Sequence, residues 1–440
     1  MNRQRDIDAI ARELIMADDI AAKQKITAEI LAIAKSKGIF LSSIQDLYKA
    51  RGEGRCPGGF TVPAINLRNL TYYLAKAIFR VAKKINAGAF IFEIAKSEMG
   101  YTAQPPIEYS GAVLAAAIKE GHAGPVFIQG DHCQMNAKMF AVDPKKEISS
   151  LKHLIEDAIT AGFFNIDIDT STLVDLDKKS VTEQQRNNFE VCAQLTQFIR
   201  EIQPEGIMVS VGGEIGEVGG KNSTAEELKA FMDGYLDSLS AGTEGISKIS
   251  IQTGTSHGGV VLPDGSIAQV KVDFETLRNL SKYAREQYKL SGAVQHGAST
   301  LPPAAFGKLP ECDAVEVHLA TQFQNMMFDS TTFPKDLKDK MYAWVKKSCA
   351  DEMKEGQTED QFIYKTRKKA LGPFKKEIMS LPESIKEGLA QEIEAKFDFL
   401  FKQLRVGDTR KLVEKFVKPV DVKLGLTKIA KAVLDGQGDD

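Results

Sequence analysis

Residues 125–133 read Pro-Val-Phe-Ile-Gln-Gly-Asp-His-Cys, a short apolar run that ends in Asp131 and His132. Two further histidines follow comparable runs, His257 in Gly-Thr-Ser-His-Gly-Gly and His296 in Gln-His-Gly-Ala-Ser. Such β-branched, apolar runs are typical of buried strands, and proteins that alternate strands with helices build their active sites at the carboxyl ends of the strands. The pattern therefore predicts three imidazoles at one rim, where they would suit a metal ion.

The segment around these motifs alternates short β-rich runs with longer amphipathic stretches. We expect strands at 61–67, 88–95, 125–131, 165–170, 207–214, 248–254, 292–297 and 314–320. Expected helices at 70–84, 147–161, 183–201, 225–240 and 274–288 are long enough to connect parallel neighbours. Together these units predict an α/β fold, a closed (β/α)8 TIM barrel. A doubly wound sheet fits less well because the turn at 67–70 has no glycine-rich phosphate fingerprint.

Two helical extensions flank the predicted barrel. We expect an N-terminal helical extension at 1–58 with two or three helices, the catalytic barrel at 59–330, and a C-terminal helical extension at 331–440. The C-terminal part shows helical apolar spacing at 336–354, 359–380 and 385–405. The charged faces of these helices are interpreted as solvated, with the alternative that one face packs on a partner subunit of a homo-oligomer.

The composition is that of an ordinary soluble enzyme. With 440 residues and 43% hydrophobic content the chain can bury a large core, and a formal charge of -2 gives no field that would attract nucleic acid or an anionic membrane. No apolar run reaches the length of a membrane span or of a secretory signal, so we expect a cytoplasmic protein without a membrane partner. The five cysteines are scattered, which argues against a disulfide framework and a zinc ribbon.

Three neutral imidazoles would supply the ligands that zinc prefers at a catalytic site and leave one position open, although other divalent transition metals accept the same donors. A single histidine is more often a hydrogen-bonded structural residue, so the interpretation depends on the coincidence of three. Asp131 beside such a cation is a candidate general acid or base, and the alternative is that it hydrogen-bonds His132 or caps a helix. Because adjacent strand residues face opposite sides, both reach the mouth only if the strand turns at Gly130.

Further acidic residues end two other predicted strands. Asp167 and Asp169 are two residues apart and so share one face of their strand, and Glu214 ends the next strand. Carboxylates buried inside a barrel need cations or hydrogen-bond donors. They are therefore interpreted as supporting the metal ligands or as an alternative metal position, and the competing interpretation is helix capping or solvation.

Small and hydroxyl residues lie in the loops after the last three predicted strands, where TIM barrels commonly bind phosphate through backbone N–H groups. They are Ser256, Gly258, Gly259, Gly297, Ser299, Thr300 and Thr321. Lys96, after the second predicted strand, is placed to touch a substrate phosphate, although a surface charge is an equal alternative.

At these residues the chain resembles the class II, metal-dependent ketose-bisphosphate aldolases. The motifs that carry the resemblance occur in the family's order: Val62-Pro-Ala-Ile-Asn66, Gly130-Asp-His-Cys133, Asp169, Glu214-Ile-Gly216, Gly254-Thr-Ser-His257 and His296-Gly-Ala-Ser299. The resemblance implies Asp131 as the proton-transfer residue and zinc as the cofactor. We expect metal ligands among His132, His257, His296, Asp169 and Glu214, and contacts to a sugar phosphate from Asn66, Lys96, Ser97, Gly258, Gly297, Ser299 and Thr321.

The chemistry fits this resemblance, because cleaving a carbon–carbon bond beside a ketone leaves a carbanion that a metal stabilises as a Lewis acid. The competing device is a lysine Schiff base, which is disfavoured because Lys248 lies at the opposite end of its strand. The chain departs from the family at Lys221-Asn222, which replaces an acidic pair, and at His318 and Ala320, which replace an asparagine and a small or acidic residue.

These departures leave three functional hypotheses open. The first is a zinc-dependent aldolase that cleaves or forms a ketose phosphate or bisphosphate. The second is a metal-dependent ketose or ketose-phosphate 4-epimerase, in which Asp131 and His318 are the two catalytic groups that exchange protons. The third is a noncatalytic subunit of a tagatose-bisphosphate aldolase, which the retention of the metal-ligand motifs disfavours.

Overall fold

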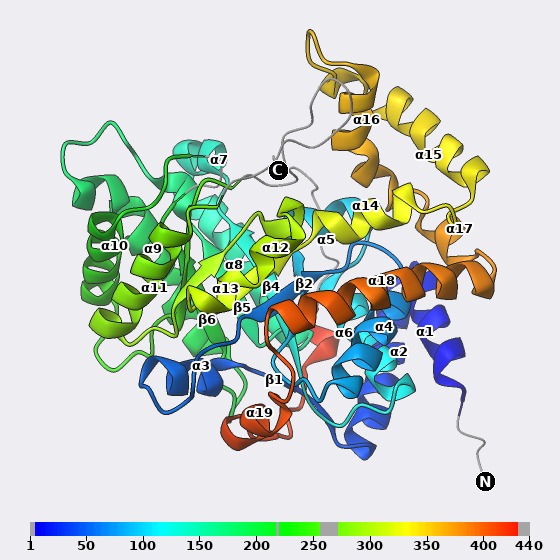
Figure 1. Ribbon diagram of the computed structural model, residues 1–440, viewed down its shortest axis with the longest axis horizontal. Coiled ribbons are helices and arrows are strands. Elements are labelled where there is room, and N and C mark those ends of the chain that lie inside the picture. The colour runs from blue at the N-terminus through cyan, green and yellow to red at the C-terminus, as the bar shows by residue number, and fades with distance from the viewer. Residues whose placement is uncertain (1–4, 217–219, 256–271, 430–440) are drawn as a thin grey trace.

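Parallel strands close into a barrel in the computed structural model, which describes residues 5–216, 220–255 and 272–429 (Figure 1). The barrel strands are β2 (Val62–Asn66), β3 (Ile91–Ala95), β4 (Gly124–Gln134), β5 (Asn165–Asp169), β6 (Ser210–Glu214), β7 (Lys248–Ile251), β8 (Ala293–Gln295) and β9 (Glu316–Leu319). Each strand pairs with the next, β9 pairs with β2, and β4 pairs with β5, which completes the circle. The predicted (β/α)8 TIM barrel is confirmed.

Helices follow every barrel strand and connect it to the next strand in the chain, as the parallel order requires, except that the helix after β9 follows the last strand. They are α4 (Thr71–Lys84), α5 (Lys96–Thr102), α6 (Pro106–Lys119), α7 (Ala137–Val142), α8 (Pro144–Thr160), α9 (Val181–Ile202), α10 (Ala225–Ser238), α11 (Phe274–Tyr288), α12 (Pro303–Phe306), α13 (Lys308–Glu311) and α14 (Thr321–Asp329). Capping boxes fix where two of them begin: Ser180 with Glu183 starts α9, and Thr224 with Glu227 starts α10. The five predicted crossover helices are confirmed within a few residues.

The N-terminal segment contains three helices, α1 (Ile7–Met16), α2 (Ile20–Ser36) and α3 (Gln45–Gly52), and a strand that the sequence did not predict, β1 (Ile39–Ser42). β1 pairs with the first part of β4, and β5 takes the same side of β4 from Gln129 onward. The Asn165 side chain fills the step between them: it accepts from the Ile44 N–H at 2.9 Å and donates to the Ile128 carbonyl at 2.9 Å. The extension therefore continues the barrel wall. Four residues are too few to show a period, which is why sequence analysis missed β1.

The C-terminal segment forms α15 (Lys335–Ser348), α16 (Glu359–Thr366), α17 (Lys375–Met379), α18 (Glu383–Gln403) and α19 (Arg410–Phe416). The segment at 359–380, whose spacing is helical, forms two helices, and a 3-10 turn and the Gly372-Pro373 pair separate α16 from α17. Proline lacks an N–H and disfavours helical backbone in the residue before it. The Gly372 N–H bonds instead to the carbonyl of Tyr101 on α5, at 2.9 Å.

Buried charges join both extensions to the barrel. Glu108 on α6 is bonded by Lys23 from α2, at 2.7 Å, and by Lys375 from α17, at 2.6 Å. On the neighbouring face α18 lies along α4 (Figure 1), with Arg80 bonded to Glu394 at 2.7 Å. The domain limits at 58 and 330 stay a prediction. Among the described helices, none combines the length and the apolar character needed to cross a bilayer.

Candidate metal centre

An irregularity in β4 brings two neighbouring side chains to the same mouth. From Gly130 to Cys133 the strand advances three residues while β5 advances two, so one extra residue bulges out. His132 lies within the bulge and has a φ of 38°, in the left-handed region that non-glycine residues rarely adopt. Asp131 and His132 thereby face the barrel mouth together, as the predicted turn of the strand at Gly130 requires. Strained backbone of this kind is concentrated at functional sites.

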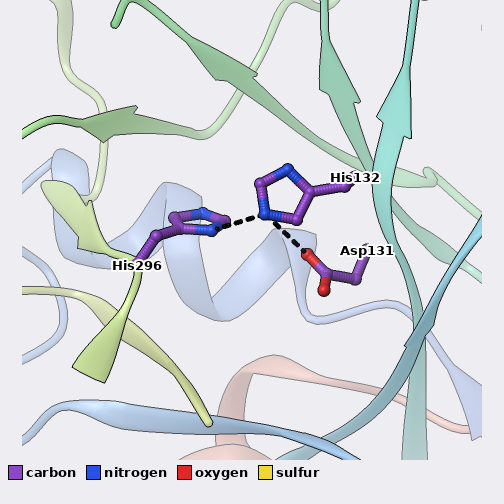
Figure 2. Close-up of side chains that lie close together, drawn as sticks. All are labelled: Asp131, His132 and His296. Atoms are coloured by element: carbon purple, nitrogen blue, oxygen red, sulfur yellow. Dashed lines mark hydrogen bonds and ion pairs between the residues drawn. The ribbon is translucent and has the colours of Figure 1, made fainter. Parts of the chain in front are cut away.

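Two of the predicted metal ligands meet across the mouth (Figure 2). His132 on β4 and His296, which follows β8, place Nε2 and Nδ1 respectively 2.9 Å apart. Asp131 Oδ1 lies 3.8 Å from the same Nε2. Ligand atoms of these three residues all lie within 4.8 Å of one another. The structure therefore brings residues 164 positions apart in the chain to a common centre.

The other nitrogen of His132 faces a second pair of predicted ligands. His132 Nδ1 donates to Asp169 Oδ2 at 3.1 Å and lies 3.8 Å from Glu214 Oε2. Asp169 is itself held by Gln134 at 2.7 Å and by the Ser171 hydroxyl at 2.7 Å. Because Nδ1 and Nε2 point away from each other, Asp169 and Glu214 do not share a centre with His296. The hydrogen bond to Asp169 is of the kind by which a carboxylate fixes the tautomer of a ligating histidine, whereas Glu214 lies beyond hydrogen-bond distance of Nδ1.

Asp131 is held from two further directions. Asn66, at the end of β2, donates from Nδ2 to Asp131 Oδ2 at 2.9 Å. His318, on β9, places Nδ1 3.1 Å from Asp131 Oδ1 and stacks on His296 with ring centroids 4.0 Å apart. Both predicted catalytic residues are thus in contact, and the predicted substrate residue Asn66 touches one of them.

The buried carboxylates and imidazoles at the mouth shift one another's pKa values. Burial opposes the charged form of Asp131, but the neighbouring His132 and His318 hold its pKa well below the usual range. Burial likewise opposes protonation of His132, yet Asp131 and Asp169 raise its pKa well above the ordinary value. Burial raises the pKa of Glu214 strongly, and the nearby Asp169 adds to this shift. Excess carboxylate in such a cluster favours a bound cation.

The donors fit a zinc ion. Zinc bonds imidazole nitrogen at about 2.0–2.1 Å in tetrahedral sites, so two ligand nitrogens stand roughly 3.3 Å apart. His132 Nε2 and His296 Nδ1 are 2.9 Å apart, which is the length of an N–H···N hydrogen bond. If a zinc ion replaced the shared proton, the two nitrogens would have to move only slightly farther apart. His132 Nδ1 and His296 Nε2 already bond Asp169 and Ser250, which leaves the facing nitrogens for the metal.

Two of the predicted phosphate-binding residues, Lys96 and Thr321, begin the helices that follow β3 and β9. Lys96 begins α5, and its Nζ lies 3.8 Å from Glu147 Oε1 on α8. Ser299 accepts from the Ala320 N–H at 2.9 Å, and Thr321 accepts from Arg68 at 3.2 Å. Ser97 is the second residue of α5, and Gly297 has a φ of 64° before a 3-10 turn. Four further predicted residues, Ser256, His257, Gly258 and Gly259, lie outside the described residues.

Sequence analysis missed several buried polar residues around the site. Glu98 accepts from Asn66 at 2.8 Å, and Glu316 accepts from His318 Nε2 at 2.8 Å. Glu93 Oε1 lies 3.1 Å from His318 Nδ1, and burial together with the nearby Asp131 raises the pKa of Glu93. A signal for two of them was present, since Glu93 interrupts an apolar strand and Glu316 shares a strand face with His318.

Comparison with known proteins fits this geometry. The sequence pattern of the family described as fructose-bisphosphate aldolase class-II matches residues 55–369. The chain belongs to this family. Residues 55–369 of this class II aldolase family member include the whole barrel and its mouth. A search of curated protein sequences finds no relative.

Solved structures are similar to the chain at low sequence identity. A protein described as a probable tagatose 6 phosphate kinase from Sinorhizobium meliloti 1021 is 13% identical, with a TM-score of 0.53 over 81% of this chain and 99% of the other. The fructose-bisphosphate aldolase from Campylobacter jejuni is 17% identical, with a TM-score of 0.49 over 84% of this chain and 97% of the other. At such identities the class II aldolase family member is divergent. The similarity to the Sinorhizobium meliloti structure concerns the fold alone.

Proposed function

We propose that the protein is a zinc-dependent aldehyde-lyase of the class II aldolase type, which cleaves or forms a ketose phosphate or bisphosphate. The observation that carries this proposal is the convergence of His132 and His296 beside Asp131 at the carboxyl ends of β4 and β8. Membership of the class II aldolase family supports the same reaction class. Nearby loop residues such as Gly297 and Ser299 suit the phosphate of the substrate.

The roles of the residues follow from their contacts. When bound between His132 and His296, zinc would act as a Lewis acid on the substrate carbonyl. Asp131 is ionised, and Asn66 fixes its carboxylate at 2.9 Å, so Asp131 is ready to take the hydroxyl proton of a ketose whose carbon–carbon bond breaks. In the synthetic direction the same carboxyl returns the proton. Asp169 keeps a proton of His132 on Nδ1, so Nε2, which faces His296, is the nitrogen that would ligate the metal.

The environment of Lys248 disfavours the Schiff-base route. Its ammonium lies inside the barrel, 2.9 Å from Asp167 and within bonding distance of Glu316. Burial opposes its charge, but these two carboxylates raise its pKa above the ordinary value. A lysine that attacks a carbonyl must be neutral, so this paired ammonium is a poor nucleophile.

Metal analysis and an activity assay together test the proposal. Protein purified without added metal is expected to hold about one zinc ion per chain and to release triose phosphate from a ketose bisphosphate such as fructose 1,6-bisphosphate. His132→Ala and His296→Ala should each lose the zinc and the activity. His153→Ala, at an exposed histidine of α8, is the matched control and should keep both. Full zinc content in both site variants would contradict the proposal.

A 4-epimerase is the second candidate, because His318 places a second proton-carrying group 3.1 Å from Asp131. The same incubation distinguishes the two reactions. Triose release supports the lyase, whereas a new ketose without triose supports the epimerase. A chain that binds no zinc and only raises the activity of another aldolase would instead be a noncatalytic subunit.

A further inference from the structure

The floor of the barrel contains a buried polar cluster below the metal centre, where TIM barrels ordinarily pack branched apolar side chains. At its middle stands Glu316, whose side chain is fully buried. Glu316 Oε1 accepts from Lys248 and from Gln129 Nε2, the latter at 3.0 Å. Glu316 Oε2 accepts from the hydroxyl of Tyr48. Donors therefore surround both oxygens of this carboxylate.

The same carboxylate reaches upward to the site. His318 Nε2 donates to Glu316 Oε1 at 2.8 Å, and His318 Nδ1 faces Asp131 at 3.1 Å. The ring also stacks on His296, with centroids 4.0 Å apart. Two hydrogen bonds on opposite sides of an imidazole fix the ring in its plane, and the stack fixes its tilt. Glu316 thus holds the side of the His318 ring that faces away from Asp131.

Tyr48 comes from outside the barrel. It lies on α3 in the N-terminal extension and is 1% exposed. Arg51 of the same helix bonds Asp313, just before β9 begins, so α3 lies at the end of the barrel opposite to the mouth. Its bond to Glu316 starts a continuous line of contacts, Tyr48 to Glu316 to His318 to Asp131. A buried carboxylate is costly unless donors satisfy it, and Tyr48 and Lys248 together supply such donors and hold Glu316 in place.

We propose that Tyr48, Lys248 and Glu316 form a positioning unit that holds His318 against Asp131, so that the N-terminal extension takes part in the active site. The inference rests on the proposed function, in which Asp131 transfers the proton. Tyr48, Lys248 and Glu316 are positioning residues, since each acts on the reacting atoms only through His318. Misplacing a general base by a fraction of an ångström lowers the rate of proton transfer more than it lowers substrate binding.

Two variants remove the support in graded steps. Glu316→Gln keeps the shape but removes the charge that His318 Nε2 faces, and kcat is expected to fall about 10- to 100-fold, the range found when partners that orient active-site histidines are changed. Tyr48→Phe removes one donor from Glu316, and kcat is expected to fall about 3- to 10-fold, in line with one buried hydrogen bond. In both variants KM and zinc content should stay close to those of the wild type.

The matched control is Tyr235→Phe. The hydroxyl of Tyr235 is equally buried and donates to Thr196 at 3.0 Å, between α9 and α10 and away from the mouth. This variant loses the same hydroxyl from the same kind of environment, so any effect of packing alone appears in it as well. Its kcat per bound zinc is expected to equal that of the wild type.

A second readout does not depend on activity. In the chain labelled with ¹⁵N-histidine, the ring N–H signals of His318 are identified by their loss in His318→Asn. The Nε2–H signal should move in Glu316→Gln, move less in the same direction in Tyr48→Phe, and stay unchanged in Tyr235→Phe. An unmoved signal in Glu316→Gln overturns the inference, whether or not the enzyme is an aldolase.

The outcomes separate the inference from the function it rests on. A wild type that cleaves ketose phosphates, together with a folded Glu316→Gln variant of undiminished kcat, overturns the positioning unit and leaves the aldolase proposal intact. If the variants lose activity only in proportion to their loss of folded, zinc-bound protein, the positioning unit is also overturned. A wild type without aldolase activity refutes the proposed function, and the His318 signals then decide the placement of the ring independently.

Discussion

At the scale of single residues, the site depends on Asp131 being both ionised and held still. Asn66 bonds one of its oxygens at 2.9 Å and His318 faces the other at 3.1 Å. This leaves little freedom for the carboxylate to rotate. A fixed acceptor of this kind is what proton transfer at a substrate hydroxyl requires.

Asp131→Asn should therefore abolish most of the turnover. The amide keeps the shape but accepts no proton, so kcat is expected to fall about 10²- to 10⁴-fold. Steady-state kinetics with parallel zinc analysis checks this, and Asp46→Asn, at an exposed position of α3, is the control for the same chemical change. Retention of more than about a tenth of the wild-type kcat would show that another group carries the proton.

Burial of His122 makes the stability of the folded protein depend on pH. Burial lowers the pKa of His122 to about 4, and its Nε2–H donates to the Pro125 carbonyl at 3.1 Å. The unfolded chain protonates this histidine near pH 6.5, so its contribution to stability is complete above that pH and is lost as the pH falls toward 4. Between pH 7 and pH 5, protonation of His122 in the unfolded chain lowers the free energy of unfolding by about 2 kcal/mol.

Urea unfolding at the two pH values measures this loss. In His122→Gln the titrating group is gone, so the free energy of unfolding should fall by about 2 kcal/mol less over the same interval than in the wild type. An equal decrease in both proteins would contradict the buried, neutral state of His122.

Much of the site was predictable from residue types at strand ends. His132, His296 and Asp131 follow apolar strands, and a barrel brings such ends to one rim. Glu316 and Tyr48 were not predictable as partners, because their contact joins residues 268 positions apart and no local pattern marks such a pairing. The bulge that turns Asp131 and His132 to the same side is likewise set by the pairing of β4 with β5.

At the scale of elements, buried ion pairs decide how the extensions attach to the barrel. Glu108 on α6 is 1% exposed and receives one lysine from each extension, Lys23 from α2 and Lys375 from α17. Removing the shared carboxylate leaves two ammonium groups in a poorly solvated place. The cost of such a loss is large because a buried charge that loses its partner is left uncompensated.

Glu108→Gln is accordingly expected to lower the free energy of unfolding by about 3–5 kcal/mol. Chemical denaturation measures this change. Glu359→Gln, which removes an exposed partner of Lys346, is the matched control and should cost less than about 1 kcal/mol. Equal effects of the two variants would show that the buried cluster contributes no more than a surface pair.

Element prediction succeeded where periodicity was long and failed where it was short or interrupted. Phe274–Tyr288 forms the predicted helix α11, whose start is fixed by the Asp273 cap. The helical spacing at 359–380 did not show that the segment divides into α16 and α17, because Gly372 and Pro373 carry a turn whose partner, Tyr101, is distant in sequence. β1 depends on its pairing with β4 rather than on its own four residues.

At the scale of the whole molecule, a metal bound at the mouth would couple stability to zinc. A ligand that binds only the folded chain adds about 3 kcal/mol when its free concentration is 100 times its Kd. Chelation is therefore expected to lower the melting temperature by a few degrees and added zinc to restore it. Differential scanning calorimetry checks this, with His132→Ala as the variant whose melting temperature should not respond. An equal response in that variant would place the stabilising ion elsewhere.

The strand β1 has a consequence for shortened versions of this protein. It covers the backbone of β4 from Gly124 to Phe127, on the side that β5 leaves open. A chain that lacks residues 1–58 would expose these amide and carbonyl groups as an unpaired strand edge, to which a strand of another copy could add. Such a truncated barrel should self-associate into β-linked aggregates, so the extension also protects the protein from aggregation through this strand edge.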